Sequence, residues 1–215
     1  MCDERWLSVR RVEMEPFRPV TAIAVPIKGV NVDTDQILPA RFLKFDRSAG
    51  YGRFLFHDLR FDDAGNERPE FILNDERFRS AEILVAGENF GCGSSREGAA
   101  YALHDFGIRA VIAPSFGDIF YNNCLRNGLL PATVPAQYAT ELRDTLLRLP
   151  DPRLTVDLEA LTITDSSGAA SPFTLGSFWR DCLLRGVDEI GLALRHTEEI
   201  EAFERERSRR LPWLS

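Results

Sequence analysis

The chain has 215 residues, of which 44% are hydrophobic and 27% are charged, and a formal net charge of -7. This is the composition of an ordinary globular protein, long enough for one core with an added lobe but too short for two large domains. The acidic charge argues against general binding to nucleic acid or anionic membranes, because both require a basic surface.

Residues 1–15 are polar and charged, and no apolar period predicts a helix or strand there. We expect them to be an N-terminal extension, with Met14 as an alternative start. They lack the basic-then-apolar order of a signal peptide, and no apolar run in the chain approaches the ~20 residues that cross a bilayer. The sequence therefore predicts a cytoplasmic protein with one domain at 16–200 and a charged tail at 201–215.

The first part of the domain combines a predicted strand at 20–27 with polar turns at 31–35 and 62–70. Between the turns, residues 40–56 form a loop rich in aromatic and basic side chains. We expect this loop to be mobile in the isolated chain, because its aromatic side chains would need an interface to be buried. These side chains are Phe42, Phe45, Tyr51 and Phe54.

A repeated strand–loop–helix unit begins at residue 82. Short apolar runs predict buried strands, and apolar residues at helical spacing predict helices that end at Gly107 and Gly128. The order predicts an α/β layer with parallel strands and right-handed crossovers. The expected strands are 83–86, 110–113 and 129–134, and the expected helices are 96–106 and 116–127, the second with Ile119, Phe120 and Leu125 directed inward.

The last third of the chain predicts a helix at 138–147, strands at 154–158 and 161–164, and a helix at 177–184. The charged tail has the composition of a solvated helix end, with a partner contact as the alternative. Neither the four cysteines nor the three histidines are clustered, so we predict no metal or iron–sulfur site held by this chain alone. The dispersed cysteines are Cys2, Cys92, Cys124 and Cys182, and the histidines are His57, His104 and His196.

Residues 88–99 carry the main functional signal, reading Glu-Asn-Phe-Gly-Cys-Gly-Ser-Ser-Arg-Glu-Gly-Ala. A glycine-rich loop before a helix presents backbone N–H groups and a partial positive charge to an anion. Arg96 adds a planar fork suited to a carboxylate or phosphate. The pattern is neither a P-loop nor a dinucleotide fingerprint. The structural alternative is a capping box, for which Ser94 and Glu97 have the spacing; the two roles are compatible.

The segment from Asn89 to Glu97 resembles the signature of the swivelling domain of the aconitase superfamily. Three further segments, in the same order, resemble motifs of isopropylmalate dehydratase small subunits. They are Asn31 to Asp35, Ala113 to Phe120 together with Asn123, and Gly128 to Pro131. The resemblance extends from about residue 17 to the end, and it implies an α/β fold with a three-layer β/β/α swivelling domain.

The resemblance also implies roles for individual residues. Ser94 matches the family's catalytic base, and Arg96 matches the arginine that binds a substrate carboxylate. Ser95 could hydrogen-bond the same carboxylate. Asp35 matches an active-site aspartate, with a turn or capping role as the alternative. Arg47 lies in the loop associated with substrate choice, where it could meet a carboxylate or remain solvated.

The implied reaction interconverts 2-isopropylmalate and 3-isopropylmalate by dehydration and rehydration, a step in leucine biosynthesis. The resemblance implies a separate large subunit that carries a four-iron four-sulfur cluster, with no cofactor in this chain. The chain would then be one subunit of a hydro-lyase and inactive alone, and its active site would lie at the interface between the two subunits.

Two departures from the family pattern stand out. Gly98 replaces a usual histidine, and residues 46–52 read Asp-Arg-Ser-Ala-Gly-Tyr-Gly where the family often has Arg-Thr-Gly. The second departure is also compatible with an alternative function, as the small subunit of a paralogous dehydratase that acts on another hydroxy-diacid such as a methylmalate or dimethylmalate. An alternative of another class is a non-enzymatic anion-binding or interaction module with the same fold.

Overall fold

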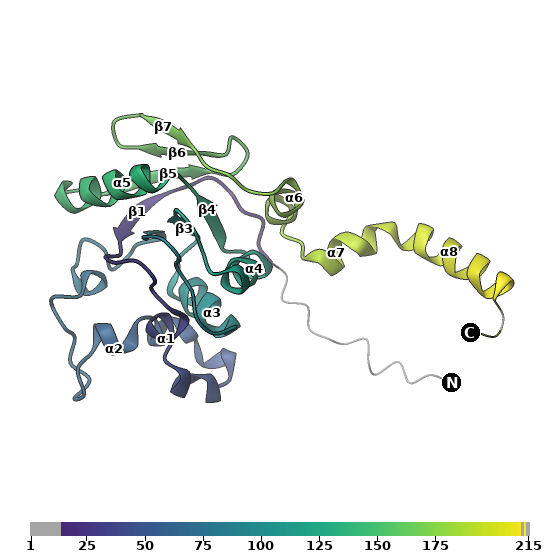
Figure 1. Cartoon of the computed structure of the whole chain (residues 1–215), viewed down its shortest axis with the longest axis horizontal. Helices are drawn as coiled ribbons and strands as arrows, with labels where there is room; N and C mark the ends of the chain where they lie inside the picture. Colours follow the sequence, from purple (N-terminus) through teal and green to yellow (C-terminus); the bar gives the residue numbers. More distant parts are fainter. Residues whose placement is uncertain (1–13, 212, 214–215) are drawn as a thin grey trace.

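The computed structural model describes residues 14–211 and residue 213. They form a mixed sheet with strand order β4-β3-β2-β1-β5-β6-β7, covered by helices (Figure 1). The strands are β1 (Val20–Pro26), β2 (Ile83–Val85), β3 (Ala110–Ala113), β4 (Leu130–Thr133), β5 (Arg153–Asp157), β6 (Thr162–Asp165) and β7 (Ala170–Pro172). The α-helices are α1 (Thr34–Ile37), α2 (His57–Arg60), α3 (Glu97–Phe106), α4 (Asp118–Arg126), α5 (Ala136–Arg148), α6 (Ser177–Arg185), α7 (Glu189–Ala193) and α8 (Thr197–Arg210).

Strand β1 belongs to both halves of the sheet. From Ala24 onward it pairs in parallel with β2, and β3 and β4 continue this parallel half. Its first residues, Val20 to Ile23, pair antiparallel with β5, and β6 and β7 follow. The predicted α/β layer with parallel strands is confirmed, and the two strands predicted near residues 154 and 161 form the antiparallel hairpin β5–β6.

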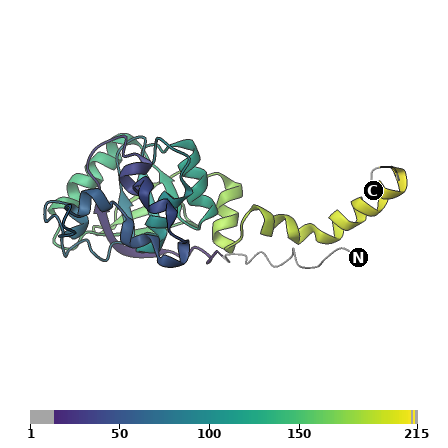
Figure 2. The same cartoon turned by 90° about the horizontal axis from the view of Figure 1, so that it is seen from below.

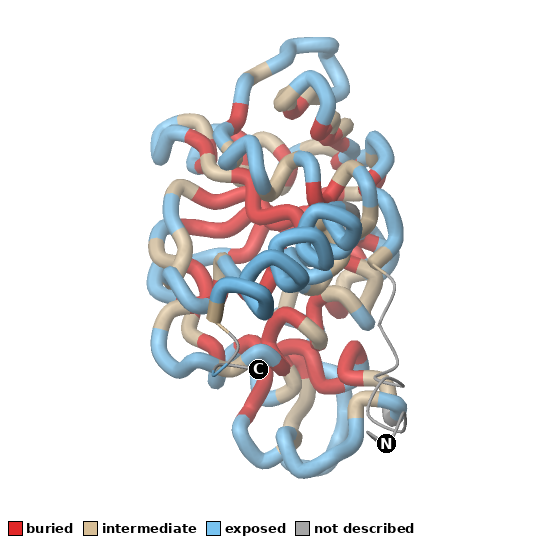
Figure 3. Tube along the Cα trace, turned by 90° about the vertical axis from the view of Figure 1, so that its right-hand side faces the viewer, coloured by how far each residue is buried: buried red, intermediate tan, exposed pale blue. Residues whose placement is uncertain are grey.

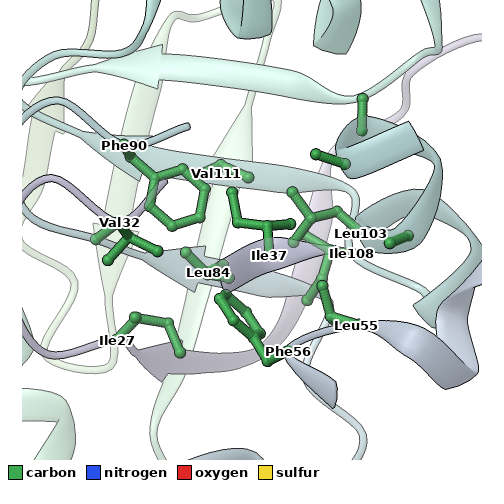
Figure 4. Packing of buried hydrophobic residues seen from close by; sticks show 14 of the residues in the cluster. Ile27, Val32, Ile37, Leu55, Phe56, Leu84, Phe90, Leu103, Ile108 and Val111 are labelled. Carbon is green, nitrogen blue, oxygen red and sulfur yellow. The ribbon is translucent and has the colours of Figure 1, made fainter. Parts of the chain in front are cut away.

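Each face of the parallel half has its own hydrophobic core, because successive strand residues point to opposite faces. On one face, Leu84 and Val111 pack with Leu103 of α3, and Figure 4 shows these side chains directed toward one another. On the other face, Ile83 of β2 packs in a second core that includes Leu142 of α5. Strands buried on both faces explain the continuous apolar runs in the sequence.

Helix α4 begins at Asp118, slightly later than predicted. The burial expected for Phe120 and Leu125 is confirmed, but Ile119 is 52% exposed and the expectation for it is wrong. Phe120 and Cys124 are both buried, and their spacing of four residues puts them on the same side of α4. Ile119 directly precedes Phe120, so its side chain points about 100° away from that side.

Residues 40–56 form three short 3₁₀ helices, η2 (Ala40–Lys44), η3 (Arg47–Ala49) and η4 (Tyr51–Phe54), and η4 packs on α3. Tyr51 and Phe54 are only 5% and 7% exposed. The expectation that these two rings need a partner to be buried is therefore wrong, because α3 covers them within the chain. The predicted mobility of the segment remains a prediction.

Gly91 is a position where the fold depends on a glycine. Its φ of +73° lies in the left-handed region, and a Cβ there would overlap the buried ring of Phe120. We expect Gly91→Ala to destabilise the chain by about 2–4 kcal/mol, because backbone strain and overpacking add. Thermal unfolding followed by circular dichroism measures this loss. Gly65→Ala is the matched control, since Gly65 also has positive φ but nothing lies within 4 Å of its Cβ position.

Candidate active site

Three segments that are distant in the sequence meet beyond the carboxyl ends of β1, β2 and β3. Asp33 and Cys92 form a parallel β-bridge, and Phe90 and Phe116 form a second one. The backbone N–H of Thr34 donates to the carbonyl of Cys92 at 2.9 Å. Parallel strands bring their carboxyl ends to one edge of the sheet, so the motifs around residues 33, 92 and 116 line one edge together.

Helix α1 is capped by Asp33, which excludes the capping alternative for Asp35. The Asp33 carboxylate accepts from the backbone N–H of Gln36 at 2.7 Å, and the Gln36 side chain accepts from the backbone N–H of Asp33 at 3.0 Å. The Asp35 carboxylate instead accepts from the backbone N–H of Ala40 at 3.3 Å, which agrees with the turn alternative, and it also forms an ion pair with Arg96 of the neighbouring loop. The Arg96 side chain is 18% exposed and that of Asp35 is 56% exposed.

The environment of Asp35 favours its charged form. The hydrogen bond from Arg96 lowers the pKa of the Asp35 carboxyl, partial desolvation opposes this, and the Arg96 charge and the N–H of Ala40 lower it further. Asp35 is therefore a carboxylate at neutral pH, and it holds the Arg96 guanidinium in place at the start of α3.

Ser94 does not cap α3. The helix begins at Glu97, its N-cap position is Arg96, and no side chain caps it. The Glu97 carboxylate instead accepts from the Asn127 side-chain amide at 2.9 Å. The predicted capping box is therefore wrong, because the helix starts too late for Ser94 to reach its first turn in that geometry.

The backbone around Ser94 explains where its side chain lies. Its carbonyl accepts from the hydroxyl of Thr34 at 3.2 Å and from the backbone N–H of Arg96 at 2.9 Å. Gly93, with φ of +92°, makes this turn possible. With its carbonyl held inward, Ser94 is exposed in front of α3, and so is Ser95. Thr34 is almost fully buried, and the sequence analysis did not identify it as part of the site, although it lies between Asp33 and Asp35.

Arg47 contacts a different group of residues. Its guanidinium lies 3.8 Å from the centroid of the Tyr101 ring, donates to the Asn127 side chain at 3.3 Å and lies 3.9 Å from a carboxylate oxygen of Asp105. It lines a cavity of about 360 Å³ that Arg109 also lines. Arg47 is thus neither freely solvated nor paired with Asp35 and Arg96, and a role in substrate binding remains a prediction.

Gly98 lies in the first turn of α3, two residues from Arg96. A Cβ at this position would come within 2.8 Å of Leu38, 2.9 Å of Leu43 and 3.3 Å of Tyr51. The absence of a side chain therefore lets residues 40–56 approach the start of α3.

We expect Gly98→His to destabilise the chain by about 1–3 kcal/mol, since a crowded core resists added volume. Leu43→Ala combined with Gly98→His should recover part of the loss, because Leu43 is 42% exposed and its removal opens space. Thermal unfolding of the single and double variants gives the coupling between the two positions. Strictly additive effects would contradict this packing.

The cysteines within the described part of the chain do not form a metal site. Cys124 and Cys182 are buried free thiols whose pKa values are raised by burial, and Cys92 is partly exposed. No group of three or more His, Cys, Asp or Glu side chains among the described residues could hold a metal ion. The same residues contain no helix with the length and apolar character needed to cross a membrane.

Residues 14–137 match the family model of the aconitase C-terminal domain, and residues 189–215 match that of the C-terminal domain of the 3-isopropylmalate dehydratase small subunit. A protein of Dinoroseobacter shibae named 3-isopropylmalate dehydratase small subunit is 50% identical over 94% of this chain and 100% of its own length. The chain belongs to the family of 3-isopropylmalate dehydratase small subunits. The family resemblance of the sequence and the predicted fold class are both confirmed.

Other relatives agree with this family assignment. The small subunit of Rhodospirillum centenum is 50% identical over 93% of this chain and 98% of its own length. The crystal structure of a 3-isopropylmalate dehydratase from Methanocaldococcus jannaschii has a TM-score of 0.62 and 27% identity, and the match covers 86% of this chain and 99% of that one. The second of the two family models begins at residue 189, ahead of the tail boundary expected at 201.

Proposed function

We propose that this chain is the small subunit of a hydro-lyase that interconverts 2-isopropylmalate and 3-isopropylmalate by dehydration and rehydration, in leucine biosynthesis. The observation that carries the proposal is the arrangement at the start of α3, where an exposed Ser94 stands next to the Arg96–Asp35 ion pair. The small-subunit relatives, about half identical over nearly the whole chain, support the same activity.

Ser94 is the proposed base that removes a carbon-bound proton from the substrate. A serine hydroxyl is a weak base, so its alkoxide needs electrostatic stabilisation. The N-terminus of α3 supplies a partial positive charge, and Arg96 adds a full one nearby in the chain. Because Ser94 does not cap the helix, its hydroxyl is not committed to a structural hydrogen bond of that kind.

Arg96 is the proposed carboxylate clamp. Its guanidinium offers five N–H donors in a fixed plane. Asp35 pairs with it and orients the group, while the remaining donors can receive a substrate carboxylate. Ser95 is the proposed hydroxyl donor to the same carboxylate, and its exposure supports this role. A hydroxy-diacid is the class of substrate that such a clamp fits.

The site as described is open, since Ser94 and Ser95 are exposed and Asp35 is more than half exposed. Closing an active site strengthens the electrostatic contacts inside it, so in this proposal the large subunit covers this edge of the sheet. A four-iron four-sulfur cluster on that subunit would act as the Lewis acid for the departing hydroxyl. Among the described residues, Cys124 and Cys182 are buried and Cys92 is partly exposed, and these dispersed thiols do not fit such a cluster.

Reconstitution tests the proposal. The chain is co-expressed with the large-subunit homologue of the same genome, kept anaerobic, and assayed by the ultraviolet absorbance of the unsaturated acid. We expect activity with 3-isopropylmalate that requires both chains. Activity with methylated malates alone would favour the paralogous dehydratase, and no activity from a fully loaded complex would favour the non-enzymatic binding module.

A further inference from the structure

The ion pair of the candidate site joins two loops, one that follows β1 and one that follows β2. The two strands pair Ala24 with Ile83, and beyond the start of both loops Asp33 pairs with Cys92. The register is the same at both places, since 83 minus 24 and 92 minus 33 are each 59. The two loops therefore depart from the strand pairing and resume it without a change of register.

Two asparagine side chains connect the loops within this gap. The Asn89 side-chain amide donates to the Asn31 side-chain oxygen at 2.8 Å, and the backbone N–H of Asn31 donates to the carbonyl of Glu88 at 2.9 Å. Both asparagines have left-handed backbones, with φ of +55° at Asn31 and +56° at Asn89. Asparagine adopts this conformation more readily than most residues, so it suits both the turn of each loop and the bond between the loops.

Asn89 also contacts a third loop, which follows β3. Its backbone N–H donates to the Ser115 hydroxyl at 2.8 Å, and the next residue, Phe90, forms a β-bridge with Phe116. The loops after β1, β2 and β3 contain three of the sequence motifs that indicated the family. Asn89 is therefore hydrogen-bonded to both of the loops that flank its own.

The arm formed by α7 and α8 extends away from these loops. In Figures 1 and 2 it leaves the body on the side of α6, whereas α1 lies elsewhere in the body. None of the residues of α8 is buried, and Figure 3 shows this helix as exposed. Within the described part of the chain, the geometry of the site loops therefore depends on contacts inside the body, such as the bond between the two asparagines.

We propose that Asn31 and Asn89 are positioning residues that set the two loops so that Asp35 meets Arg96 and the guanidinium is presented to a substrate carboxylate. This inference rests on the proposed function, because it concerns the same carboxylate clamp. Asp35 follows Asn31 by four residues and Arg96 follows Asn89 by seven. A displacement at the asparagines is therefore passed along both loops to the partners of the ion pair.

The order of the Arg96 side chain tests the proposal without an assay of activity. We expect the nitrogen–proton nuclear Overhauser effect of the Arg96 Nε–Hε group, measured by nuclear magnetic resonance on the full chain at mildly acidic pH, to be that of an ordered side chain. Asn89→Gly and Asn31→Gly should each lower it, because glycine keeps the left-handed backbone accessible and removes only the side chain. Asn66→Gly is the matched control, since Asn66 donates a similar bond to Asp62 at 3.0 Å in a turn outside these loops.

Aspartate substitutions give a sharper comparison, because they change the charge equally at the two positions. Asn31→Asp keeps the oxygen that accepts from Asn89, so Arg96 should stay ordered. Asn89→Asp replaces the donating amide with an acceptor and brings two oxygens together, so Arg96 should loosen as it does in Asn89→Gly. Unchanged order of Arg96 in both glycine variants, or equal loosening in the two aspartate variants, would overturn the proposal.

Kinetics of the assembled enzyme connect the asparagine pair to the reaction. Asn89→Gly should raise KM for 3-isopropylmalate about 2–10-fold, the range that corresponds to one net hydrogen bond, with a smaller change in kcat. In an Asp35→Asn background it should have little further effect, because both changes act through Arg96. An unchanged KM despite a loosened Arg96 contradicts the positioning role. If the unmodified complex is inactive, the proposed function fails, and the order of Arg96 still decides whether the asparagines position it.

Discussion

Ser94→Ala in the assembled enzyme is expected to lower kcat by about 10²–10⁴-fold, the range by which a positioned base accelerates proton transfer. The thermal unfolding temperature should change little, because Ser94 is exposed and does not cap α3. KM should also change little, since the proposed carboxylate clamp is intact. Steady-state kinetics with 3-isopropylmalate and a thermal unfolding scan measure all three quantities.

Ser95→Ala is the matched control for this variant. It removes the same atom one residue farther along the loop, and we expect a modest effect that falls mainly on KM. The two results together separate the base from a carboxylate ligand. If Ser94→Ala instead lost about 1 kcal/mol or more of stability and kept near-normal turnover, the hydroxyl would have a structural role and the proposed base would be another group.

Arg96→Lys is expected to lower kcat/KM by about 10²-fold, close to 2.7 kcal/mol of transition-state stabilisation. Lysine keeps the charge but loses the planar fork that can hold Asp35 and a substrate carboxylate together. Asp35→Asn keeps the arginine and removes its ion-pair partner, so a smaller loss is expected, mainly through KM. If the two substitutions are coupled, the double variant will lose less than the sum of the single losses. Near-wild-type kcat/KM in Arg96→Lys would remove Arg96 from the carboxylate clamp.

The ion pair also predicts a pH dependence. Since Arg96 lowers the pKa of Asp35 below the usual 3.8, the pair persists above that value and is lost only as the pH falls through the lowered pKa. KM should therefore show no contribution from Asp35 between about pH 5 and 8. Comparison of the KM profile with that of Asp35→Asn isolates this contribution. A step in KM above pH 5 that disappears in Asp35→Asn would contradict the lowered pKa. Because Asp35 is more than half exposed, the effect on overall stability is expected to be small.

The parallel strand–helix units and the loop that carries the site are readable from the sequence. Apolar runs such as 83–86 and 110–113, separated by helical spacing and glycine stops, are local signals, and the structure confirms strands and helices there. The residues matched to the family motifs are likewise local patterns. Local patterns also suggested that Ser94 caps its helix, which is wrong, because a cap depends on where the helix begins and the spacing alone does not define that.

The relations between distant segments became visible only in the folded chain. Asp35 and Arg96 are 61 positions apart (96 minus 35), and their ion pair exists because β1 and β2 end at the same edge of the sheet. The rings of Tyr51 and Phe54 are buried because η4 packs on α3, another long-range contact. Such contacts depend on how the strands pair and how the helices pack. The spacing of apolar residues along the chain predicts neither of these. The chemistry of the individual residues could therefore be predicted from the sequence, whereas only the fold brings these residues together in one site.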